Sequence, residues 1–174
     1  MALVDEKAWE KQTAPLLIAD LQSYYGGQIQ PAGLRDDRFH GTDFFWNRHG
    51  KACRLACRVR KAGFMKYKDD LTIREDRPQS SQKTELDKIR SGEWASIYAY
   101  AFSDGQRILH WSLFRMSRFN PDAPFSYMPG FGPRDEQDTI TRIYRISGQP
   151  VGFLLDLVTN NAIPERQEPK RTAA

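Results

Sequence analysis

The 174-residue sequence predicts a single α/β domain with a mixed central sheet of about five to seven strands flanked by helices; an α+β arrangement is also possible. Hydrophobic residues make up 40% of the chain, as in ordinary globular proteins. Helical and strand patterns alternate along residues 1–162 with no internal repeat or linker. Residues 163–174 are polar and contain prolines, and we expect a disordered tail there.

The first expected element is a helix over about residues 5–25, rich in apolar positions. Pro15 argues against one uninterrupted helix and favours a restart near this residue. Gly26-Gly27 ends the helix, and we expect a loop from there to about Phe39.

The next elements form an expected hairpin. Residues 42–46 (TDFFW) predict a strand and residues 47–50 (NRHG) a turn. Residues 51–61 fit either a strand or a helix, and both place three basic side chains on one face. In the strand, one face carries Cys53, Leu55, Cys57 and Val59, and the other carries Arg54, Ala56, Arg58 and Arg60.

The sequence predicts mainly strands in the second half of the chain. A capping box at Thr84–Asp87 predicts a short helix that ends at Gly92. Asp104-Gly105 predicts a hairpin turn, and a loop is expected over 120–133. The strands are expected over 70–74, 94–102, 107–113, 139–146 and 151–158. Strand 94–102 is apolar on both faces, so we expect it at the centre of the sheet.

Several classes of protein are excluded by what the sequence lacks. It has no apolar run long enough to cross a membrane and no signal-peptide pattern, so we expect a cytoplasmic protein without a membrane partner. Its two cysteines make no disulfide framework. It also lacks the glycine-rich phosphate-binding loops and the catalytic serine or cysteine motifs.

The net charge of +4 is unevenly distributed. Residues 1–50 hold five basic and seven acidic residues, and residues 69–174 hold fourteen and fifteen. Residues 51–68 hold seven basic residues and no acidic one: Lys51, Arg54, Arg58, Arg60, Lys61, Lys66 and Lys68. Phosphate neutralisation is the usual reason for such a cluster, which predicts a nucleic-acid contact. A solvated basic face and a contact with an acidic protein surface are the alternatives.

A resemblance rests on residues 40–61 (HGTDFFWNRHGKACRLACRVRK). Their order of strand with Asp, turn, and strand with charged residues resembles the core of the PD-(D/E)XK, or restriction-endonuclease-like, superfamily. The general order of elements over residues 5–115 is also similar. The resemblance implies a nuclease-like fold and, in active members, Mg²⁺ held by carboxylates.

The resemblance assigns roles to individual residues. Asp43 matches the family's metal-binding aspartate, Asp20 stands on the first helix, and Arg58 falls where the family has its lysine. Ala56 occupies the position of the acidic residue, so one carboxylate of the family pair is missing unless Asp70 or Glu75 replaces it.

Three functions follow from these assignments. The first is a nucleic-acid-binding protein, expected to act on duplex DNA, with a nuclease-like fold, a degenerate metal site and no cofactor. The second is an active Mg²⁺-dependent nuclease in which Asp43 and Arg58 are catalytic and Asp20 or Asp70 completes the metal site. The third is a small accessory or inhibitor protein, of the kind phages and mobile elements carry, that binds a protein partner.

Overall fold

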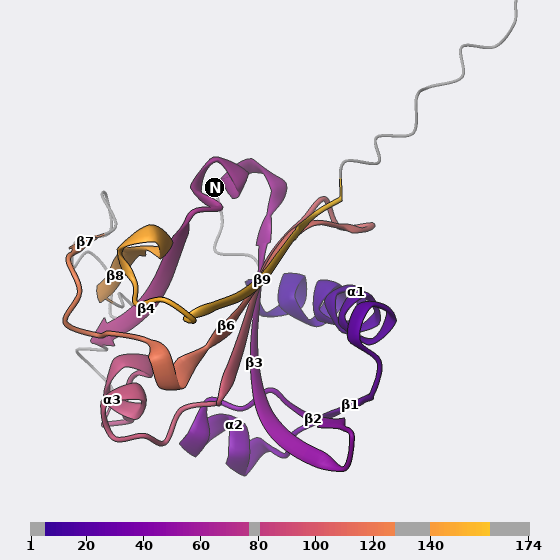
Figure 1. Ribbon diagram of the computed structural model, residues 1–174, viewed down its shortest axis with the longest axis horizontal. Coiled ribbons are helices and arrows are strands. Elements are labelled where there is room, and N and C mark those ends of the chain that lie inside the picture. The colour runs from indigo at the N-terminus through magenta and orange to yellow at the C-terminus, as the bar shows by residue number, and fades with distance from the viewer. Residues whose placement is uncertain (1–5, 77–80, 128–139, 161–174) are drawn as a thin grey trace, which may run out of the picture.

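The computed structural model describes residues 6–76, 81–127 and 140–160 (Figure 1). The predicted C-terminal tail, 163–174, lies outside the described residues. The helices are α1 (Glu6–Tyr25), α2 (Leu34–His40) and α3 (Glu85–Arg90), with short 3-10 turns η1 (Ala62–Tyr67), η2 (Met116–Arg118) and η3 (Ile146–Gly148). The strands are β1 (Gln28–Pro31), β2 (Phe44–Arg48), β3 (Lys51–Lys61), β4 (Asp70–Asp76), β5 (Ile97–Ser103), β6 (Ile108–Arg115), β7 (Phe125–Tyr127), β8 (Ile140–Arg145) and β9 (Leu154–Thr159).

A mixed six-stranded sheet forms the centre of the molecule, in the order β1-β2-β3-β5-β6-β9. All neighbours are antiparallel except β3 and β5, which run parallel with Cys57 opposite Ala99. Parallel neighbours need a crossover connection, and here the chain passes through η1, β4 and α3 between them. The expected mixed α/β architecture is confirmed.

The two faces of this sheet are covered differently, as the nearly edge-on view in Figure 1 shows. Helix α1 covers one face and buries Leu17 and Leu21 against Leu55, Val59 and Trp111 of the sheet. The three-stranded antiparallel sheet β4-β8-β7 and the short helix α3 cover the other. The expectation of helices on both flanks is therefore corrected: the second layer is mainly a sheet.

Strand β3 settles the ambiguity of residues 51–61. The segment is a strand because β2 and β5 supply hydrogen-bonding partners on both of its edges. Leu55 and Val59 pack toward α1, and Ala56 packs in the core on the opposite side. Strand β5 is buried from Tyr98 to Ser103, which confirms its central place.

Helix α1 continues through Pro15, so the expected interruption is wrong. Pro15 is exposed, and the carbonyl that loses its helical hydrogen bond there can bond to water. The buried residues Leu17 and Leu21, which follow it on the inner face, hold the helix against the sheet.

Two expected loops contain regular structure. Segment 28–39 includes β1 and most of α2, and segment 120–133 includes β7 in its described part. Both strands are short, and each is defined by pairing with a strand later in the chain, β2 or β8. Local periodicity does not reveal such pairing.

Helix α3 begins where the capping box predicts. The Thr84 hydroxyl accepts a hydrogen bond from the Asp87 backbone at 3.2 Å, and the Asp87 carboxylate accepts one from the Thr84 backbone at 3.0 Å. The first helical residue is therefore Glu85, whose side chain is buried. Among the described residues, no helix is long and apolar enough to span a membrane.

Candidate functional site

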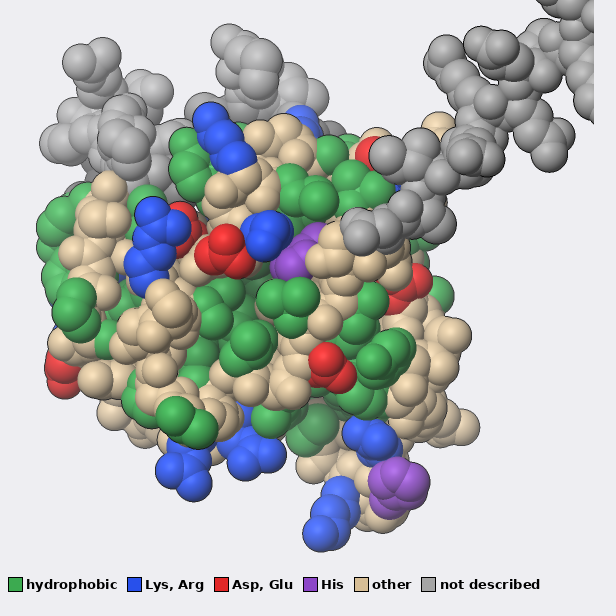
Figure 2. All heavy atoms as spheres, turned by 45° about the horizontal axis from the view of Figure 1, so that its top comes forward, with side chains coloured by type: hydrophobic (Ala, Val, Ile, Leu, Met, Phe, Trp, Pro, Cys, Tyr) green, Lys and Arg blue, Asp and Glu red, His purple; other side chains and the backbone are tan. Residues whose placement is uncertain are grey.

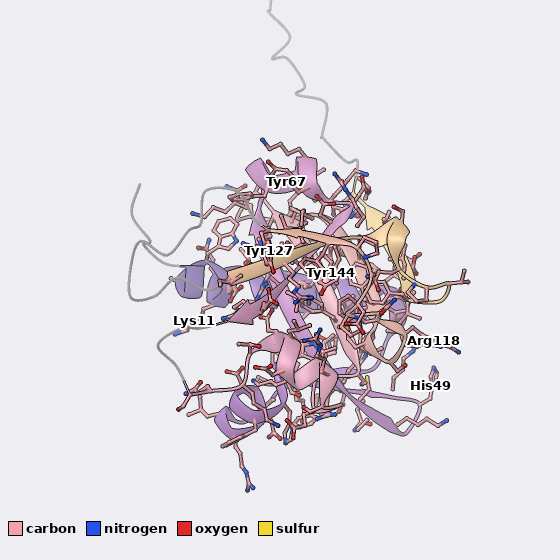
Figure 3. The ribbon with its side chains drawn as sticks, turned by 90° about the vertical axis from the view of Figure 1, so that its left-hand side faces the viewer. Lys11, His49, Tyr67, Arg118, Tyr127 and Tyr144 are labelled. Carbon is pink, nitrogen blue, oxygen red and sulfur yellow. The ribbon has the colours of Figure 1, made fainter. Side chains whose placement is uncertain are left out.

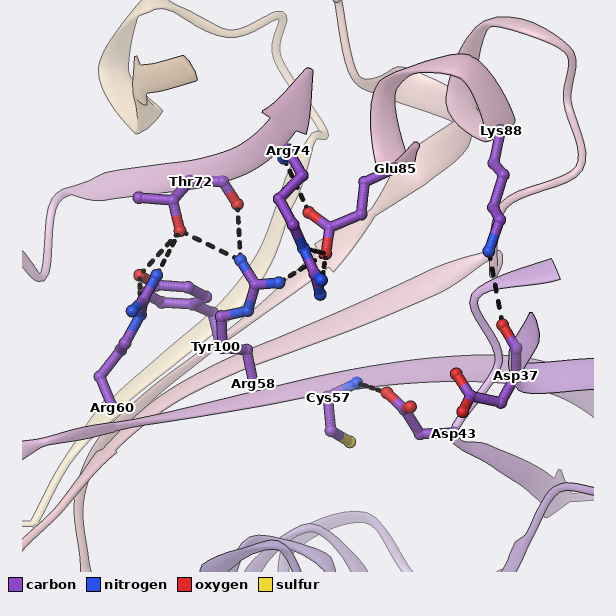
Figure 4. A network of polar contacts seen from close by, with 10 residues as sticks. All are labelled: Asp37, Asp43, Cys57, Arg58, Arg60, Thr72, Arg74, Glu85, Lys88 and Tyr100. Atoms are coloured by element: carbon purple, nitrogen blue, oxygen red, sulfur yellow. Dashed lines mark hydrogen bonds and ion pairs between the residues drawn. The ribbon is translucent and has the colours of Figure 1, made fainter. Parts of the chain in front are cut away.

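A buried ion pair joins the central sheet to the layer that contains β4 and α3 (Figure 4). The Arg58 guanidinium on β3 donates to the Glu85 carboxylate on α3 at 2.5 Å, and the two residues are 9% and 7% exposed. Arg58 also donates to the Thr72 carbonyl on β4 at 3.3 Å. Arg74 of β4 donates to Glu85 through its backbone at 2.9 Å and through its guanidinium at 2.8 Å. Glu85 is thus held by two arginines from two different sheets.

These arginines determine the charge of Glu85. Burial alone would raise the pKa of the Glu85 carboxyl, but Arg58, Arg74 and the Arg74 backbone N–H lower it to about 2. The carboxylate is therefore ionised throughout the physiological range, and it neutralises a guanidinium that would otherwise be buried without a partner.

Asp43 lies just before β2, beside Cys57 of β3 and below Glu85 in the view of Figure 4. Its backbone N–H donates to the Leu55 carbonyl at 3.0 Å, and its carboxylate accepts a hydrogen bond from the Cys57 backbone at 2.6 Å. Both bonds are to β3, so the strand pairing fixes the orientation of the carboxyl group.

The surroundings of Asp43 favour its protonated form. Burial raises the pKa of the Asp43 carboxyl to about 7, the Cys57 N–H opposes this rise, Asp37 and Glu10 add to it, and Arg58 opposes it weakly. Near neutral pH such a carboxyl exists in both protonation states, which suits a group that gives or takes a proton.

These residues line a cavity of about 510 Å³, which we call the Asp43 cavity. Its size is typical of a ligand site. Ala56 also forms part of its wall. The charged residues in the lining are Glu10, Asp37, Asp43 and Glu85, and Arg58, Arg74, Lys83 and Lys88.

Gly41 and Trp94 shape one wall of the Asp43 cavity. Gly41 follows α2 in the left-handed conformation, with φ 54°. A Cβ atom there would lie 2.2 Å from Cζ3 of the Trp94 ring. Only glycine fits both the backbone and this contact, which lets the chain turn directly into Asp43.

The three arginines predicted to contact nucleic acid lie on one face of β3, as alternation requires, but that face packs against protein. Arg58 is buried in its ion pair. Arg60 donates to the Thr72 hydroxyl at 3.0 Å and to the Tyr100 hydroxyl at 3.2 Å. Arg54 donates to the Glu93 carbonyl at 3.0 Å. Their principal contacts are therefore within the protein.

The four predicted lysines lie apart. Lys51 is exposed at the β2–β3 hairpin, whereas Lys61, Lys66 and Lys68 belong to the opposite end of β3 and to the turn after it. Figure 3 shows these two ends, marked by His49 and Tyr67, on opposite sides of the molecule. On the face seen in Figure 2, Lys and Arg side chains are scattered among hydrophobic ones.

The predicted metal ligands are not brought together. Asp20 accepts a hydrogen bond at 3.3 Å from Asn160, which also bonds to the carbonyl of Ile108 on β6, two strands away from β3. Asp70 pairs with Arg145 at 2.8 Å within the second sheet. Glu75, the other proposed replacement, pairs with Arg142. Asp43 is the one predicted ligand in the cavity named after it.

The structure adds acidic residues that the sequence patterns did not single out: Glu10 on α1, Asp37 on α2 and Glu85 on α3. The sequence held one indication for Glu85: the capping box at Thr84 makes it the first residue of the helix. In the described part of the chain, no three His, Cys, Asp or Glu side chains are grouped closely enough to hold a metal ion.

Comparisons with protein-family models, with curated proteins and with solved structures found no match to this chain. The function is therefore inferred from the chemistry of the Asp43 cavity and its surroundings.

Replacing Glu85 by glutamine should lower the free energy of unfolding by about 3–5 kcal/mol at pH 7, because Arg58 would keep a buried charge without its counterion. The folded-state pKa of about 2 lies below the ordinary value of 4.5, so this stabilisation is complete above pH 4.5 and is lost as the pH falls toward 2. Urea unfolding at pH 7 and pH 3 measures both effects. Glu93→Gln, at an exposed ion pair with Lys83, is the matched control and should change stability little. Equal effects of the two substitutions would contradict the role given to Glu85.

Asp43→Asn should have the opposite effect on stability. The folded-state pKa of about 7 lies above the ordinary value of 3.8, so ionising Asp43 destabilises the folded protein progressively as the pH rises from about 4 to 7. Asparagine keeps an acceptor for the Cys57 N–H and carries no charge. We expect the variant to be more stable than the wild type by roughly 2–4 kcal/mol at pH 8 and equally stable near pH 4. A difference that does not change with pH in urea unfolding would refute the shifted pKa.

Proposed function

We propose that the protein binds nucleic acid, in the first instance duplex DNA, at the mouth of the Asp43 cavity, using a nuclease-like core that lacks a complete protein metal site. One observation carries the proposal. Asp43, Ala56 and Arg58, the positions matched through the resemblance to the PD-(D/E)XK superfamily, line a single cavity. Asp43 is also oriented by a backbone N–H of the same strand that carries Arg58.

The topology around the cavity supports a restriction-endonuclease-like core. Strands β1, β2 and β3 form an antiparallel meander, and the chain then passes through η1, β4 and α3 to β5, which lies parallel to β3. Helix α1 packs on the face of these strands that points away from β4 and α3. The helix and the hairpin of β2 and β3 follow the order on which the resemblance rests, but the next strand of that order, β4, lies in the second sheet.

The cations at the cavity mouth offer contacts for phosphate groups. The side chains of Arg74 and Lys83 are 34% and 55% exposed, and both line the Asp43 cavity. Arg35 is exposed in an adjoining recess that shares Lys83 with this cavity. Replacing counterions on DNA phosphates by such side chains is the main source of affinity in protein–DNA complexes. These cations take over the role that the sequence pattern gave to the arginines of β3.

Carboxylates beside Asp43 favour a second candidate, a Mg²⁺-dependent nuclease. Mg²⁺ commonly binds one or two carboxylates, with water and substrate phosphate oxygens as its other ligands. Asp43, Glu10 and Asp37 line one cavity, so Asp43 with one of the other two would hold the ion in a site of that kind. The described residues form no site with three protein ligands. Bound there, the ion would neutralise developing charge on a phosphate. Asp43 and the second carboxylate, Glu10 or Asp37, would orient the ion and the water molecules bound to it.

The binding proposal predicts that affinity for a duplex DNA falls steeply with salt, and that Arg35→Ala and Lys83→Ala each reduce the slope of log K against log salt by about 1. Fluorescence anisotropy over a salt series measures this slope. Arg118→Ala, at an exposed arginine of η2, is the control and should leave the slope unchanged. Absence of binding at low salt would refute the proposal and favour a protein partner.

A cleavage assay with the same purified protein distinguishes the nuclease from the DNA-binding protein without nuclease activity. Nicking of supercoiled plasmid in Mg²⁺ or Mn²⁺ that Asp43→Asn abolishes would establish the nuclease. Binding without nicking in either metal would exclude it and leave the binding protein.

A further inference from the structure

A recess of about 640 Å³, which we call the Trp94 recess, lies beside the Asp43 cavity. Trp94 forms a wall of both spaces, and no other described residue belongs to both linings. The other walls come from β3, from α3, from the segment just before β5 and from η2 with the residues after it. The size of the recess is typical of a site for a small organic ligand, and the proposed nucleic-acid contact uses none of these other walls.

The indole N–H of Trp94 gives the first indication of a ligand. Trp94 is 9% exposed, and its Nε1 atom has no hydrogen-bond partner in residues 6–76, 81–127 and 140–160. The Trp94 atoms that a Cβ at Gly41 would meet are Cζ3, Cε3 and Cη2, at the benzene-ring end of the indole and on the side of the Asp43 cavity. Nε1 is at the other end of the indole, on the side of the Trp94 recess. A buried N–H without an acceptor costs free energy that an acceptor on a ligand would recover.

Arg54 gives a second, independent indication. Its half-buried guanidinium lines the recess and donates through Nη1 to the Glu93 carbonyl at 3.0 Å. Within the described part of the chain, Nε and Nη2 have no acceptor and Arg54 has no ion pair. The other two charged residues of the lining, Arg90 and Asp122, pair with each other at 3.2 Å. The lining therefore keeps the positive charge of Arg54, which an anion would neutralise.

Most of the remaining wall is apolar. Ile89, Met116 and Phe119 line the recess and offer contacts to the apolar part of a ligand. The charge selects among anionic groups. A carboxylate carries one negative charge and accepts two parallel hydrogen bonds from one edge of a guanidinium. A phosphate monoester carries about −1.5 to −2 near neutral pH, which is more than Arg54 neutralises.

We infer that the Trp94 recess binds a small organic monocarboxylate with an apolar body. Nε and Nη2 of Arg54 and the Trp94 N–H donate to the carboxylate, and the apolar body lies against Ile89, Met116 and Phe119. This ligand site goes beyond the proposed function and does not depend on it.

The test follows the Trp94 indole N–H signal of the isotopically labelled full chain by NMR as phenylacetate or isovalerate is added. The signal is assigned from its absence in Trp94→Phe. We expect at least one of the two carboxylates to shift it saturably. Phenylacetamide has the same apolar body as phenylacetate without the charge, and it should bind about tenfold more weakly or worse, because the charged hydrogen bonds to Arg54 are lost.

Arg54→Gln keeps a donor for the Glu93 carbonyl but removes the charge, and it should weaken binding of the carboxylate by about tenfold or more. Arg48→Gln is the matched control and should leave the affinity unchanged. Arg48 is an exposed arginine of β2 that contacts the Tyr25 ring of α1, on the other face of the sheet.

The inference is overturned if neither carboxylate shifts the signal, or if phenylacetate and phenylacetamide bind equally well. Equal binding by the wild type and by Arg54→Gln, with unchanged thermal unfolding, would also overturn it. Acetate and inorganic phosphate are the anion controls: if either binds as tightly as phenylacetate, the apolar walls contribute nothing and the assigned ligand class is wrong. The comparison of acid and amide uses the wild-type protein, so it decides the question even if Arg54→Gln fails to fold. No DNA is present, so a failure of DNA binding leaves this result unaffected.

Discussion

The buried pair between Arg58 and Glu85 is the interaction on which the arrangement of the layers depends. A guanidinium in the interior costs several kcal/mol unless a carboxylate compensates it. Arg58 belongs to the central sheet, and its compensation comes from α3. Arg74 of β4 binds the same carboxylate, so β4 and α3 are both fixed relative to β3. Because burying these charges requires all three elements in place, the pair disfavours alternative placements of the second layer.

The same pair determines the chemistry of the cavity next to it. Arg58, which is ion-paired with Glu85, lowers the pKa of Asp43 far less than burial raises it. Asp37 and Glu10 raise the pKa of Asp43 further, to about 7, so the carboxyl group keeps its proton up to about that pH. A cation, or a phosphate with its counterion, that entered the cavity would shift the pKa of Asp43, because either one changes the charge close to its carboxyl group. The protonation state of Asp43 would therefore change when a ligand of the proposed class binds in the cavity.

Much of the fold follows from local sequence patterns. The strand alternative for residues 51–61 gives the two faces of β3, although the sequence also allowed a helix there. The doubly apolar segment after Trp94 gives the central strand, and Thr84 with Asp87 gives the start of α3. The site is less accessible from sequence, since its contacts join residues far apart: Arg58 and Glu85 are 27 positions apart. Basic residues on one strand face look alike whether a second layer covers them or solvent does. The sequence pattern therefore located Asp43 and the basic strand but not the partners that bury Arg58.

We propose that nucleic acid binds at the mouth of the Asp43 cavity and not along the arginines of β3. The most direct measurement is a map of backbone amide chemical shifts as duplex DNA is added to the isotopically labelled protein. The largest changes are predicted in α2, in the segment from Gly41 to Asp43, and at Lys83. Changes confined to the β2–β3 hairpin, to η1 or to β9, with the amides around Asp43 unaffected, would contradict binding at the Asp43 cavity.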